Sequence, residues 1–551
     1  MAEERMIETD VLVIGGGIAG AFAAIRAREK GLNVTLVDKS YMGKSGSTAG
    51  AGMGFMVFNA DSECDLDLAM KRTAERSEYI NHREWTEIRL KESWAVYESL
   101  VSWGVEFPVE NEKYGTLIKG PGGILTARIK RRGVAPPLRQ QALKVGVTIM
   151  DKVMITDLIK HDGKVVGAVG FPVMSTELDF FIFKAKATVI AAGRCMLRTP
   201  MNDTNSATGD GQAIAYGAGA EFEGDTGRGV LVGFSGYPSW RGGRSSLTLS
   251  ALFVDSGGKS IALPGEADFD LELAFHEGRG PIYFDLDAAS PEDIDRVWRH
   301  QQNSDRLESE RMGFDPRKRG KYQAIGGLTS FMGGAIWPVD TKCTSTLPGL
   351  YTAGDSIALA GAGLSGSGVT GNRAGLAAAE YASKAEKPVI DAEELARARK
   401  VTFAPIERKS GFNPRWVTQQ LINTMQPYYI FVIKHEKRLQ AAITMVEFYK
   451  EQYAPKLLAR DIHELRLAHE TKNMLLGAEM TLKTSLFRTE SRGTHYREDY
   501  PRRDDPAWLA WVKLKDEGGK MKLWKEAVPE EWWPDLSKPY EERYPRRFPG
   551  E

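Results

Sequence analysis

The apolar and polar residues near the start of the chain follow the pattern of a strand, a helix and a second strand. A short apolar run at 10–17 ends in glycines and predicts a buried strand, and the alanine-rich run at 18–31, closed by Gly31, predicts a helix. A second apolar run at 33–40 predicts another strand. This order of elements predicts an α/β unit of the Rossmann type, which binds nucleotides.

Other regions have a different periodicity. Residues 61–140 lack clear glycine signals and predict helices inserted in the nucleotide-binding domain. From 391 to 486, apolar residues recur at spacings of three and four, which predicts a helical bundle. The tail at 506–551 is rich in Trp, Tyr and Pro with little periodicity, so we expect an extended arm packed on this chain or on another.

The composition is that of a globular protein with no overall charge to attract a partner. The chain has 551 residues, 42% of them hydrophobic, and its 73 basic and 73 acidic residues cancel, which argues against nucleic acid as a partner. Three scattered cysteines fit a reducing cytoplasm and are too few for an iron–sulfur site made by this chain alone. Acidic residues stand where a signal peptide would be basic, and the first apolar run is too short to span a bilayer, so we expect no membrane segment.

A glycine triad joins the first strand to the first helix. Gly15 allows the tight turn, Gly17 lets the backbone approach a pyrophosphate, and Gly20 lets the helix pack on the strand. The helix N-terminus attracts the anion. Asp38 ends the second strand, where its carboxylate can accept hydrogen bonds from both ribose hydroxyls. Together these features predict a dinucleotide site.

A second glycine-rich unit, at 347–382, decides between the dinucleotides. A short strand ends in Asp355, and a glycine-rich loop leads to a helix that we expect to begin near Val369. An enzyme that binds NAD has no obvious need for a second glycine-rich unit, whereas the longer, extended FAD molecule can contact one. Asp355 would accept a hydrogen bond from the ribityl chain, and the helix N-terminus would face the flavin pyrimidine. Between the two units, 187–195 predicts the strand that returns to the nucleotide fold, and 205–225 adds a further glycine turn and helix.

The expected FAD contacts come from all of these segments. They are Gly15, Gly17, Ile18, Ala19, Gly20, Asp38, Lys39, Ser40, Gly46, Ser47, Thr48, Gly52, Ala192, Gly193, Thr208, Asp210, Gly354, Asp355, Gly368 and Val369.

These blocks, in this order, resemble the fumarate reductase and succinate dehydrogenase flavoprotein superfamily over most of the chain. The resemblance includes SATGDGQAIAYGAGAEF, EGRGPIYFDL at 277–286, FMGGAIWPVD at 331–340 and TESRGTHYREDYPRRDD at 489–505. In the family, a segment like the last one follows the helical bundle and turns back toward the flavin, so we expect an interface there rather than a solvated charged face. The segment GSGVTGNRAGLAAA also resembles the adenylylsulfate reductase alpha subunit.

The resemblance implies an α/β fold with a Rossmann-like FAD-binding domain, an inserted α+β capping domain and a C-terminal helical bundle. The expected boundaries are 1–235 for the first part of the FAD-binding domain, with its helical insert at 61–140, then 236–325 for the capping domain, 326–385 for the second part of the FAD-binding domain, 386–490 for the helical domain and 491–551 for the C-terminal arm.

The chain departs from the family at the residues that serve fumarate and succinate. Ser47 stands at the expected position of the histidine that binds FAD covalently in those enzymes, so we expect non-covalent FAD. The His-Pro-Thr-Gly turn, the arginine before the EGRG block and the histidine beside FMGG are absent, and Val369 stands at the register of a second substrate arginine. A dicarboxylate would leave charges unpaired in a low-dielectric pocket, at a cost of several kcal/mol. We therefore expect a substrate other than a simple C4 dicarboxylate.

Four residues are the predicted catalytic candidates. Arg373 lies in the loop expected to face the flavin, and His276, just before EGRG, could act as an acid. His495 and Arg497 lie in the closing segment that reaches the redox centre in the family. For each, an ion pair or a structural hydrogen bond is the open alternative. Further candidates are Arg228, Arg241, Arg244, Arg279 and Trp240, the last of which could stack on a planar substrate.

Two functions follow from these expectations. The first is an FAD-dependent oxidoreductase that acts on a small molecule in the cytoplasm. The second is an electron-transfer protein that resembles the alpha subunit of adenylylsulfate reductase and passes electrons to a separate iron–sulfur protein. In either case we expect an oligomer or complex formed through the C-terminal arm.

Overall fold

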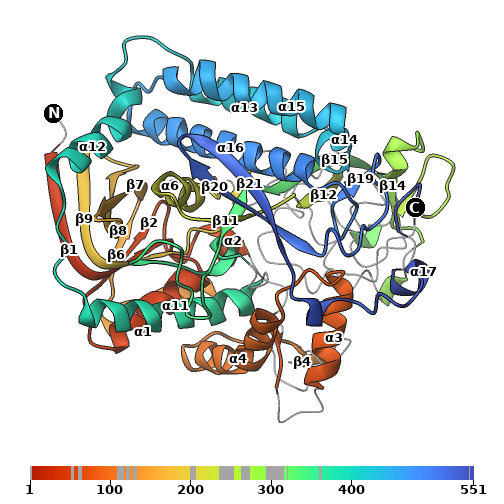
Figure 1. Cartoon of the computed structure of the whole chain (residues 1–551), viewed down its shortest axis with the longest axis horizontal. Helices are drawn as coiled ribbons and strands as arrows, with labels where there is room; N and C mark the ends of the chain where they lie inside the picture. The colour runs from red at the N-terminus through yellow and green to blue at the C-terminus, as the bar shows by residue number, and fades with distance from the viewer. Residues whose placement is uncertain are drawn as a thin grey trace.

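A computed structural model gives the fold of the chain, and Figure 1 shows a central sheet with helices on both of its faces. The two chain ends lie at opposite ends of the view. The structure describes residues 3–50, 55–59, 65–107, 117–119, 125–127, 133–198, 206–226, 228–234, 253–261, 273–288, 290–292, 294, 316–318, 320–358, 363–544 and 547–551.

A seven-stranded sheet forms the centre of the described chain, in the order β6-β2-β1-β9-β8-β7, with β17 beside β9. The strands are β1 (Glu3–Ile14), β2 (Val34–Asp38), β6 (Thr148–Asp151), β7 (Val153–His161), β8 (Lys164–Pro172), β9 (Asp179–Ile190) and β17 (Leu350–Thr352). The strands β6, β2, β1, β9 and β17 pair in parallel, whereas β7, β8 and β9 pair in antiparallel fashion. The predicted return of 187–195 to the nucleotide fold corresponds to the end of β9, beside β1.

Both faces of this sheet are buried, which explains the continuous apolar run at the end of β1. Successive side chains of a strand point to opposite faces. Val11 accordingly packs in the core that contains α1 (Ile18–Glu29), and Leu12 packs in the core that contains α6 (Asp210–Ala218).

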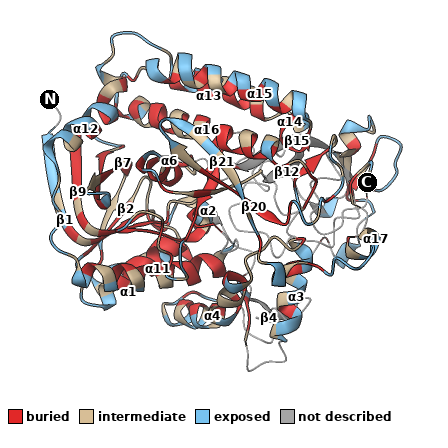
Figure 2. Cartoon of the chain, viewed as in Figure 1, coloured by how far each residue is buried: buried red, intermediate tan, exposed pale blue. Residues whose placement is uncertain are grey.

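Helix α11 (Leu364–Lys384) crosses α1 with almost no side chain between the two backbones. A Cβ atom on Gly371 would lie 2.2 Å from the carbonyl oxygen of Ala19, and one on Gly375 would lie 2.4 Å from that of Ala23. Such distances are impossible for real side chains, so glycine is required at both crossing points. Figure 2 shows α11 buried along most of its length.

The predicted start of this helix near Val369 is wrong, because the structure places it at Leu364. Glycine is a poor helix former in isolation, and the run of glycines therefore suggests a loop. The close contact with α1 favours glycine in this helix despite its low propensity. As a result Val369 is a buried core residue inside the helix, 1% exposed.

The insert at 61–140 combines helices with a small sheet. Its helices follow the prediction, and a three-stranded sheet in the order β3-β5-β4 accompanies them. The elements are α3 (Leu66–Arg76), α4 (Arg83–Ser102), α5 (Ala135–Val145), β3 (Phe55–Val57), β4 (Leu117–Lys119) and β5 (Leu125–Ala127).

A second, antiparallel sheet covers the region of the expected capping domain. Its order is β10-β15-β14-β13, with β12 beside β15. The strands are β10 (Cys195–Met196), β12 (Arg228–Phe234), β13 (Phe253–Val254), β14 (Tyr283–Asp285) and β15 (Lys321–Met332). Much of 236–325 lies outside the described residues. Strand β15 is continuous across 325 and 326, so no break in secondary structure marks the predicted boundary there.

A bundle of helices follows, as the periodicity of 391–486 predicts. Residues of α13, α15 and α16 share one buried cluster. The helices are α12 (Ala392–Glu407), α13 (Pro414–Met425), α14 (Tyr428–Phe431), α15 (Glu436–Phe448) and α16 (Ile462–Phe487). Figure 2 shows that α13 and α15 expose their outer faces, whereas α16 is mostly buried.

The tail is wrongly predicted as an extended arm without periodicity. Strands β20 (Ala510–Glu517) and β21 (Lys520–Ala527) form a hairpin whose turn, Gly518 and Gly519, has positive φ angles. The hairpin completes a sheet in the order β16-β11-β20-β21, with β11 at Phe222–Gly224 and β16 at Gly334–Ile336. The tail therefore packs on this chain. The signal that was missed is the alternation of apolar and polar residues on both sides of Gly518 and Gly519.

Replacing Gly371 by Ala should lower the melting temperature, because overpacking a buried contact costs about 1–3 kcal/mol. Gly217→Ala is the matched control. Gly217 is also helical but exposed, and a Cβ atom there would meet nothing within 4 Å, so the control should be neutral or slightly stabilising. Circular dichroism melts of both variants measure the difference. Equal melting temperatures would contradict the close helix crossing.

Candidate cofactor site

A cavity that is partly open to solvent lies at the carboxyl ends of β1, β2 and β9. Ligands bind at this edge of open α/β sheets. The lining combines the glycine turn after β1, the end of β2 with the segment 45–48, the residues after β9, and Gly354 and Asp355. The cavity thus brings together both halves of the predicted FAD unit.

The glycine turn is shaped so that the backbone itself faces the cavity. Gly15 has a φ of +109°, and a Cβ atom there would lie 2.3 Å from the carbonyl oxygen of Ala191. Gly17 begins α1 without any side-chain cap, and the amide of Ile18 donates to Thr48 Oγ1 at 3.0 Å. The remaining amides of the first turn of α1, together with the helix dipole, suit an anionic pyrophosphate. The residues present therefore fit the phosphate portion of FAD.

Asp38 fixes the two loops that flank the cavity. Its Oδ2 accepts from the amide of Gly16 at 2.8 Å, and its Oδ1 accepts from the amide of Ser40 at 2.7 Å. The carboxylate lines the cavity and has further lone pairs for the ribose hydroxyls.

Lys39 is held by a buried cluster of charges. Its Nζ lies 2.6 Å from Asp210 and 2.8 Å from Glu470, whose side chain is fully buried in α16. Glu470 also pairs with Arg198 at 2.8 Å and with Arg466 at 2.9 Å. Burial alone would lower the pKa of Lys39, but the carboxylates of Asp210 and Glu470 outweigh it and the pKa lies above the usual value. Glu470 was not predicted, because no local pattern indicates a contact with a strand at the other end of the chain.

The far end of the cavity is formed by Gly354 and Asp355. Gly354 has a φ of +67° and its amide donates to Thr370 Oγ1 of α11 at 2.9 Å. Next to this end, Arg194 pairs with Asp225. Burial opposes the charge of Arg194, yet Asp225 and Asp355 hold its pKa above the usual value.

Most of the predicted cofactor residues that the structure describes line this cavity. They are Gly15, Gly17, Ile18, Ala19, Asp38, Lys39, Ser40, Gly46, Ser47, Thr48, Ala192, Gly193, Asp210, Gly354 and Asp355. Four others lie beside it without lining it, and Gly52 lies outside the described residues. Those four are Gly20, Thr208, Gly368 and Val369.

Each of these four has a role in the surrounding structure. Gly20 packs on the Gly15 carbonyl, and Thr208 accepts from Lys39 at 2.7 Å. Gly368 and Val369 lie inside α11.

Several lining residues were missed. Gly16 and Ser45 lie between residues that were predicted to contact FAD, and Ser206 and Ala207 lie in the predicted glycine turn at 205–225. These four could have been predicted from the residues next to them in the sequence. The others are apolar residues of the sheet, of α6 and of the turn after β9, and a serine inside α11, for which the sequence carries no such signal. The missed residues are Ile14, Gly16, Val37, Ser45, Val153, Ile155, Ala191, Ser206, Ala207, Ile214 and Ser367.

Arg373 does not lie in a loop that faces the cavity, and that expectation is wrong. It lies inside α11, where its guanidinium pairs with Glu92 of α4 and donates to the carbonyl of Thr341 at 2.8 Å. It is not among the lining residues. Hydrogen bonds to Glu92 raise its pKa.

The other catalytic candidates lie outside the cavity lining. His276 Nε2 lies 3.5 Å from Glu498, and the His276 ring packs edge-on against Tyr428. His495 and Arg497 are buried, at 2% and 1% exposed. Of the further candidates, Arg279 pairs with Glu277 and Asp255, and the side chains of Arg228, Arg241, Arg244 and Trp240 lie outside the described residues.

The closing segment at 489–505 is a buried network of ion pairs. Glu490 accepts two hydrogen bonds of 2.8 Å from Arg492, which also lies 2.6 Å from Asp505. Arg503 pairs with Glu78 at 2.6 Å and so ties the segment to the insert between α3 and α4. The segment is therefore not a solvated face. Its contact with a second chain remains a prediction.

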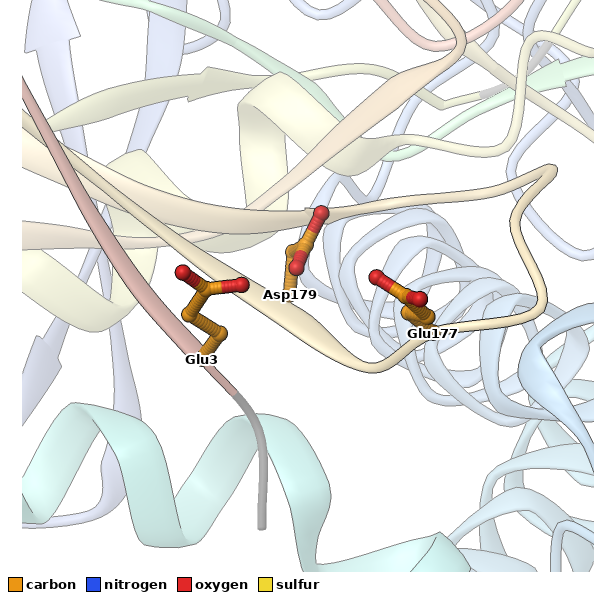
Figure 3. A group of neighbouring side chains, drawn as sticks. All are labelled: Glu3, Glu177 and Asp179. Carbon is orange, nitrogen blue, oxygen red and sulfur yellow. The ribbon is translucent and has the colours of Figure 1, made fainter.

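A separate group of carboxylates lies at the opposite end of the sheet. Glu3, Glu177 and Asp179 lie together at the start of β1 and β9, as Figure 3 shows. Arg5 lies 3.2 Å from Asp179 and 3.5 Å from Glu3 and supplies a balancing positive charge. The whole length of β1 separates this group from the cavity, which lies after Ile14. It plays no part in the cofactor site.

Two family descriptions match the sequence. The one described as FAD binding domain matches residues 10–375, and the one described as fumarate reductase flavoprotein C-term matches residues 418–544.

Curated relatives match nearly the whole chain. The chain is 27% identical to one of the subunits of the fumarate reductase (CoM/CoB) of Methanothermobacter marburgensis, over 93% of this chain and 98% of that protein. It is 29% identical to an uncharacterized FAD-dependent oxidoreductase of Methanocaldococcus jannaschii, over 95% of this chain and 98% of that protein.

Solved structures share the fold. Adenylylsulfate reductase of Archaeoglobus fulgidus superimposes with a TM-score of 0.80 at 23% identity, over 96% of this chain and 97% of that chain. A quinol fumarate reductase chain of E. coli also gives a TM-score of 0.80, at 18% identity, over 95% of this chain and 97% of that chain. At these identities the likeness shows the fold alone.

Asp38→Ala should raise the dissociation constant for FAD about 10- to 100-fold, the usual range for losing hydrogen bonds to a charged group. Asp10→Ala is the matched control, because Asp10 also accepts from a backbone amide, that of Asn33, but does not line the cavity. Quenching of FAD fluorescence measures both. If both variants bind FAD like the unaltered protein, Asp38 does not contact the cofactor.

Glu470→Gln should weaken FAD binding about 5- to 50-fold, a coupling typical of linked sites, because Lys39 loses a charged partner. The melting temperature should also fall, since breaking a buried ion pair costs about 3–5 kcal/mol. Glu479→Gln is the control, because Glu479 is a buried, lysine-paired glutamate of the same helix that lies outside the cavity lining. A loss of stability in both variants with unchanged FAD binding would limit Glu470 to a structural role.

Proposed function

The chain belongs to the FAD-binding family of fumarate reductase and succinate dehydrogenase flavoproteins, and on that premise we propose an oxidoreductase with non-covalent FAD that acts on a small molecule other than a simple C4 dicarboxylate. The superfamily, the fold class and the FAD cofactor that the sequence predicts are confirmed. The chain is an FAD-dependent oxidoreductase. The substrate and the mode of FAD attachment are the proposed parts.

The cavity at the carboxyl ends of the parallel strands carries this proposal. FAD supplies the acceptance and donation of electrons when it is bound. The chain's own residues bind and orient it. The amide-lined turn at Gly15 and Gly17 would hold the pyrophosphate, Asp38 the ribose, and Asp355 the ribityl chain. Arg194 keeps a positive charge beside Asp355.

The residue choice at this cavity supports a non-covalent cofactor. Ser47 lines the cavity at the segment where the family's covalent histidine is expected, and a serine hydroxyl does not form that bond to flavin. Asp225 directly follows β11 and pairs with Arg194. It stands in the sequence block where the histidine that binds a dicarboxylate in the family is absent.

A second function is that of an electron-transfer subunit working with a separate iron–sulfur protein. The names of the relatives favour it, since several are subunits of larger enzymes. The chain has three cysteines, and Cys195 and Cys343 are buried and free. Clusters would therefore have to come from another chain. Copurification of a brown complex would support this function, and a yellow single-chain enzyme the first.

The remaining expectations concern the surroundings of the protein. In the part of the chain that the structure describes, no helix is long and apolar enough to cross a membrane. A cytoplasmic location and an oligomer or complex formed through the C-terminal arm belong to the proposal.

Acid precipitation of the purified yellow protein should release all of the flavin into the supernatant, as measured by its visible spectrum. In the native protein, the bound FAD should not be reoxidised by fumarate after anaerobic reduction, nor reduced by succinate. A family member that carries the covalent histidine serves as the comparison for retention of flavin. Flavin that stays with the precipitate, or turnover of fumarate, would contradict the proposal.

A further inference from the structure

Three carboxylates gather at the end of the central sheet that lies opposite the cofactor cavity. They belong to Glu3 at the start of β1, Asp179 at the start of β9 and Glu177 in the loop before β9. One oxygen from each carboxylate lies within 4.8 Å of the other two. Figure 3 shows Asp179 between Glu3 and Glu177. Acidic side chains gather on many protein surfaces, so their proximity alone does not indicate a ligand.

The register of the sheet brings two of these charges together. Strands β1 and β9 pair in parallel, and Glu3 stands directly beside Asp179. Residues placed in this way project from the same face of the sheet, where like charges repel each other. The pairing continues to the end of β1, and a slip of one residue would turn every side chain of the strand to the other face. The sheet therefore holds the two carboxylates together against their repulsion.

Asp179 provides a second, independent observation. It is 7% exposed, and its Oδ1 has no hydrogen-bond partner in the part of the chain that the structure describes. The other oxygen, Oδ2, lies 3.2 Å from Arg5. Buried polar atoms are nearly always paired, and an ionised carboxylate can only accept. The missing partner of Oδ1 is therefore a donor or a cation.

The charges of the group do not balance. Arg5 lies 3.5 Å from Glu3 and 3.2 Å from Asp179, whereas Glu177 has no ion-pair partner among the described residues. Three carboxylates and one guanidinium leave two negative charges. A divalent cation supplies the two positive charges that neutralise them.

The ligand atoms and their spacing favour calcium. A set of oxygens alone suits a hard cation rather than a transition metal. Oxygens on opposite sides of one calcium ion lie up to about 5 Å apart, and those around magnesium only about 4 Å. The spacing of 4.8 Å fits calcium without a movement of the strands. Glu3 and Glu177 are exposed, so water can supply the further ligands that calcium takes.

We propose that Glu3, Glu177 and Asp179 bind one calcium ion, with Asp179 Oδ1 on the buried side of the site. Arg5 keeps its contact with Asp179 Oδ2. The ion joins the first strand of the chain to β9 and to the loop before it, and it neutralises the repulsion between Glu3 and Asp179. The site lies apart from the cofactor cavity, so this inference does not depend on the proposed function.

The test is calorimetric titration of the full-length, FAD-loaded protein, first stripped of metal with EDTA and then freed of the chelator. Calcium chloride should bind at one site per chain with a dissociation constant on the order of 10⁻⁴ M, because two of the three ligands are exposed and flexible. Magnesium chloride, titrated separately, should bind roughly 10-fold more weakly or worse, since magnesium releases its water reluctantly and needs closer oxygens.

Four variants identify the residues responsible. Asp179→Asn and Glu177→Gln should each weaken calcium binding about 10-fold or more, because each removes a charged ligand. Arg5→Gln should strengthen it on the order of 10-fold, because a competing positive charge is lost. Glu386→Gln is the matched control for Glu177→Gln and should bind calcium like the unaltered protein, since Glu386 is an exposed loop glutamate outside the group.

Several results would overturn the inference. They are the absence of calcium binding, tighter binding of magnesium than of calcium, calcium binding that Glu177→Gln leaves unchanged, and calcium binding that Arg5→Gln weakens. An equal loss in Glu386→Gln would also overturn it, because the binding would then reflect general surface charge. If Asp179→Asn does not fold, Glu177→Gln decides, since the Glu177 side chain is exposed and its replacement leaves the sheet intact.

Discussion

The close contact between the backbones of α1 and α11 is the constraint on which the cofactor site depends. The two helices belong to segments more than three hundred residues apart, and glycine at 371 and 375 lets them meet at the Ala19 and Ala23 carbonyls. This contact fixes where Gly354 and Asp355 stand relative to the turn at Gly15. The pairing of β17 with β9 holds the same segment from the side of the sheet.

A second level of organisation comes from buried charges. Glu470 joins the helical bundle to the second strand of the nucleotide unit through Lys39, and Arg503 joins the closing segment to the insert through Glu78. Each pair connects segments that are distant in sequence. A buried ion pair adds little net stability relative to apolar packing, but it penalises any arrangement that separates its partners. These pairs therefore specify how the parts of the chain assemble.

The sequence predicts the local parts of this structure and fails where contacts between distant segments decide. The glycine triad, Asp38 and Asp355 lie at the predicted cavity because each belongs to a short pattern whose geometry is local. The start of α11 and the position of Arg373 are mispredicted because glycines that suggest a loop are required by contact with α1. Glu470 and the apolar lining at Val153 and Ile155 have no local signal at all.

The hairpin β20–β21 has a consequence for how the protein is made. Strand β20 pairs with β11, which belongs to the middle of the chain, and β16 occupies the other edge of β11. During synthesis, β11 emerges from the ribosome nearly three hundred residues before β20, its last partner. The edge of β11 therefore stays open until translation is almost complete, and an open strand edge is a template for pairing with another chain. A ribosome that stops before residue 510 would release a chain prone to aggregation.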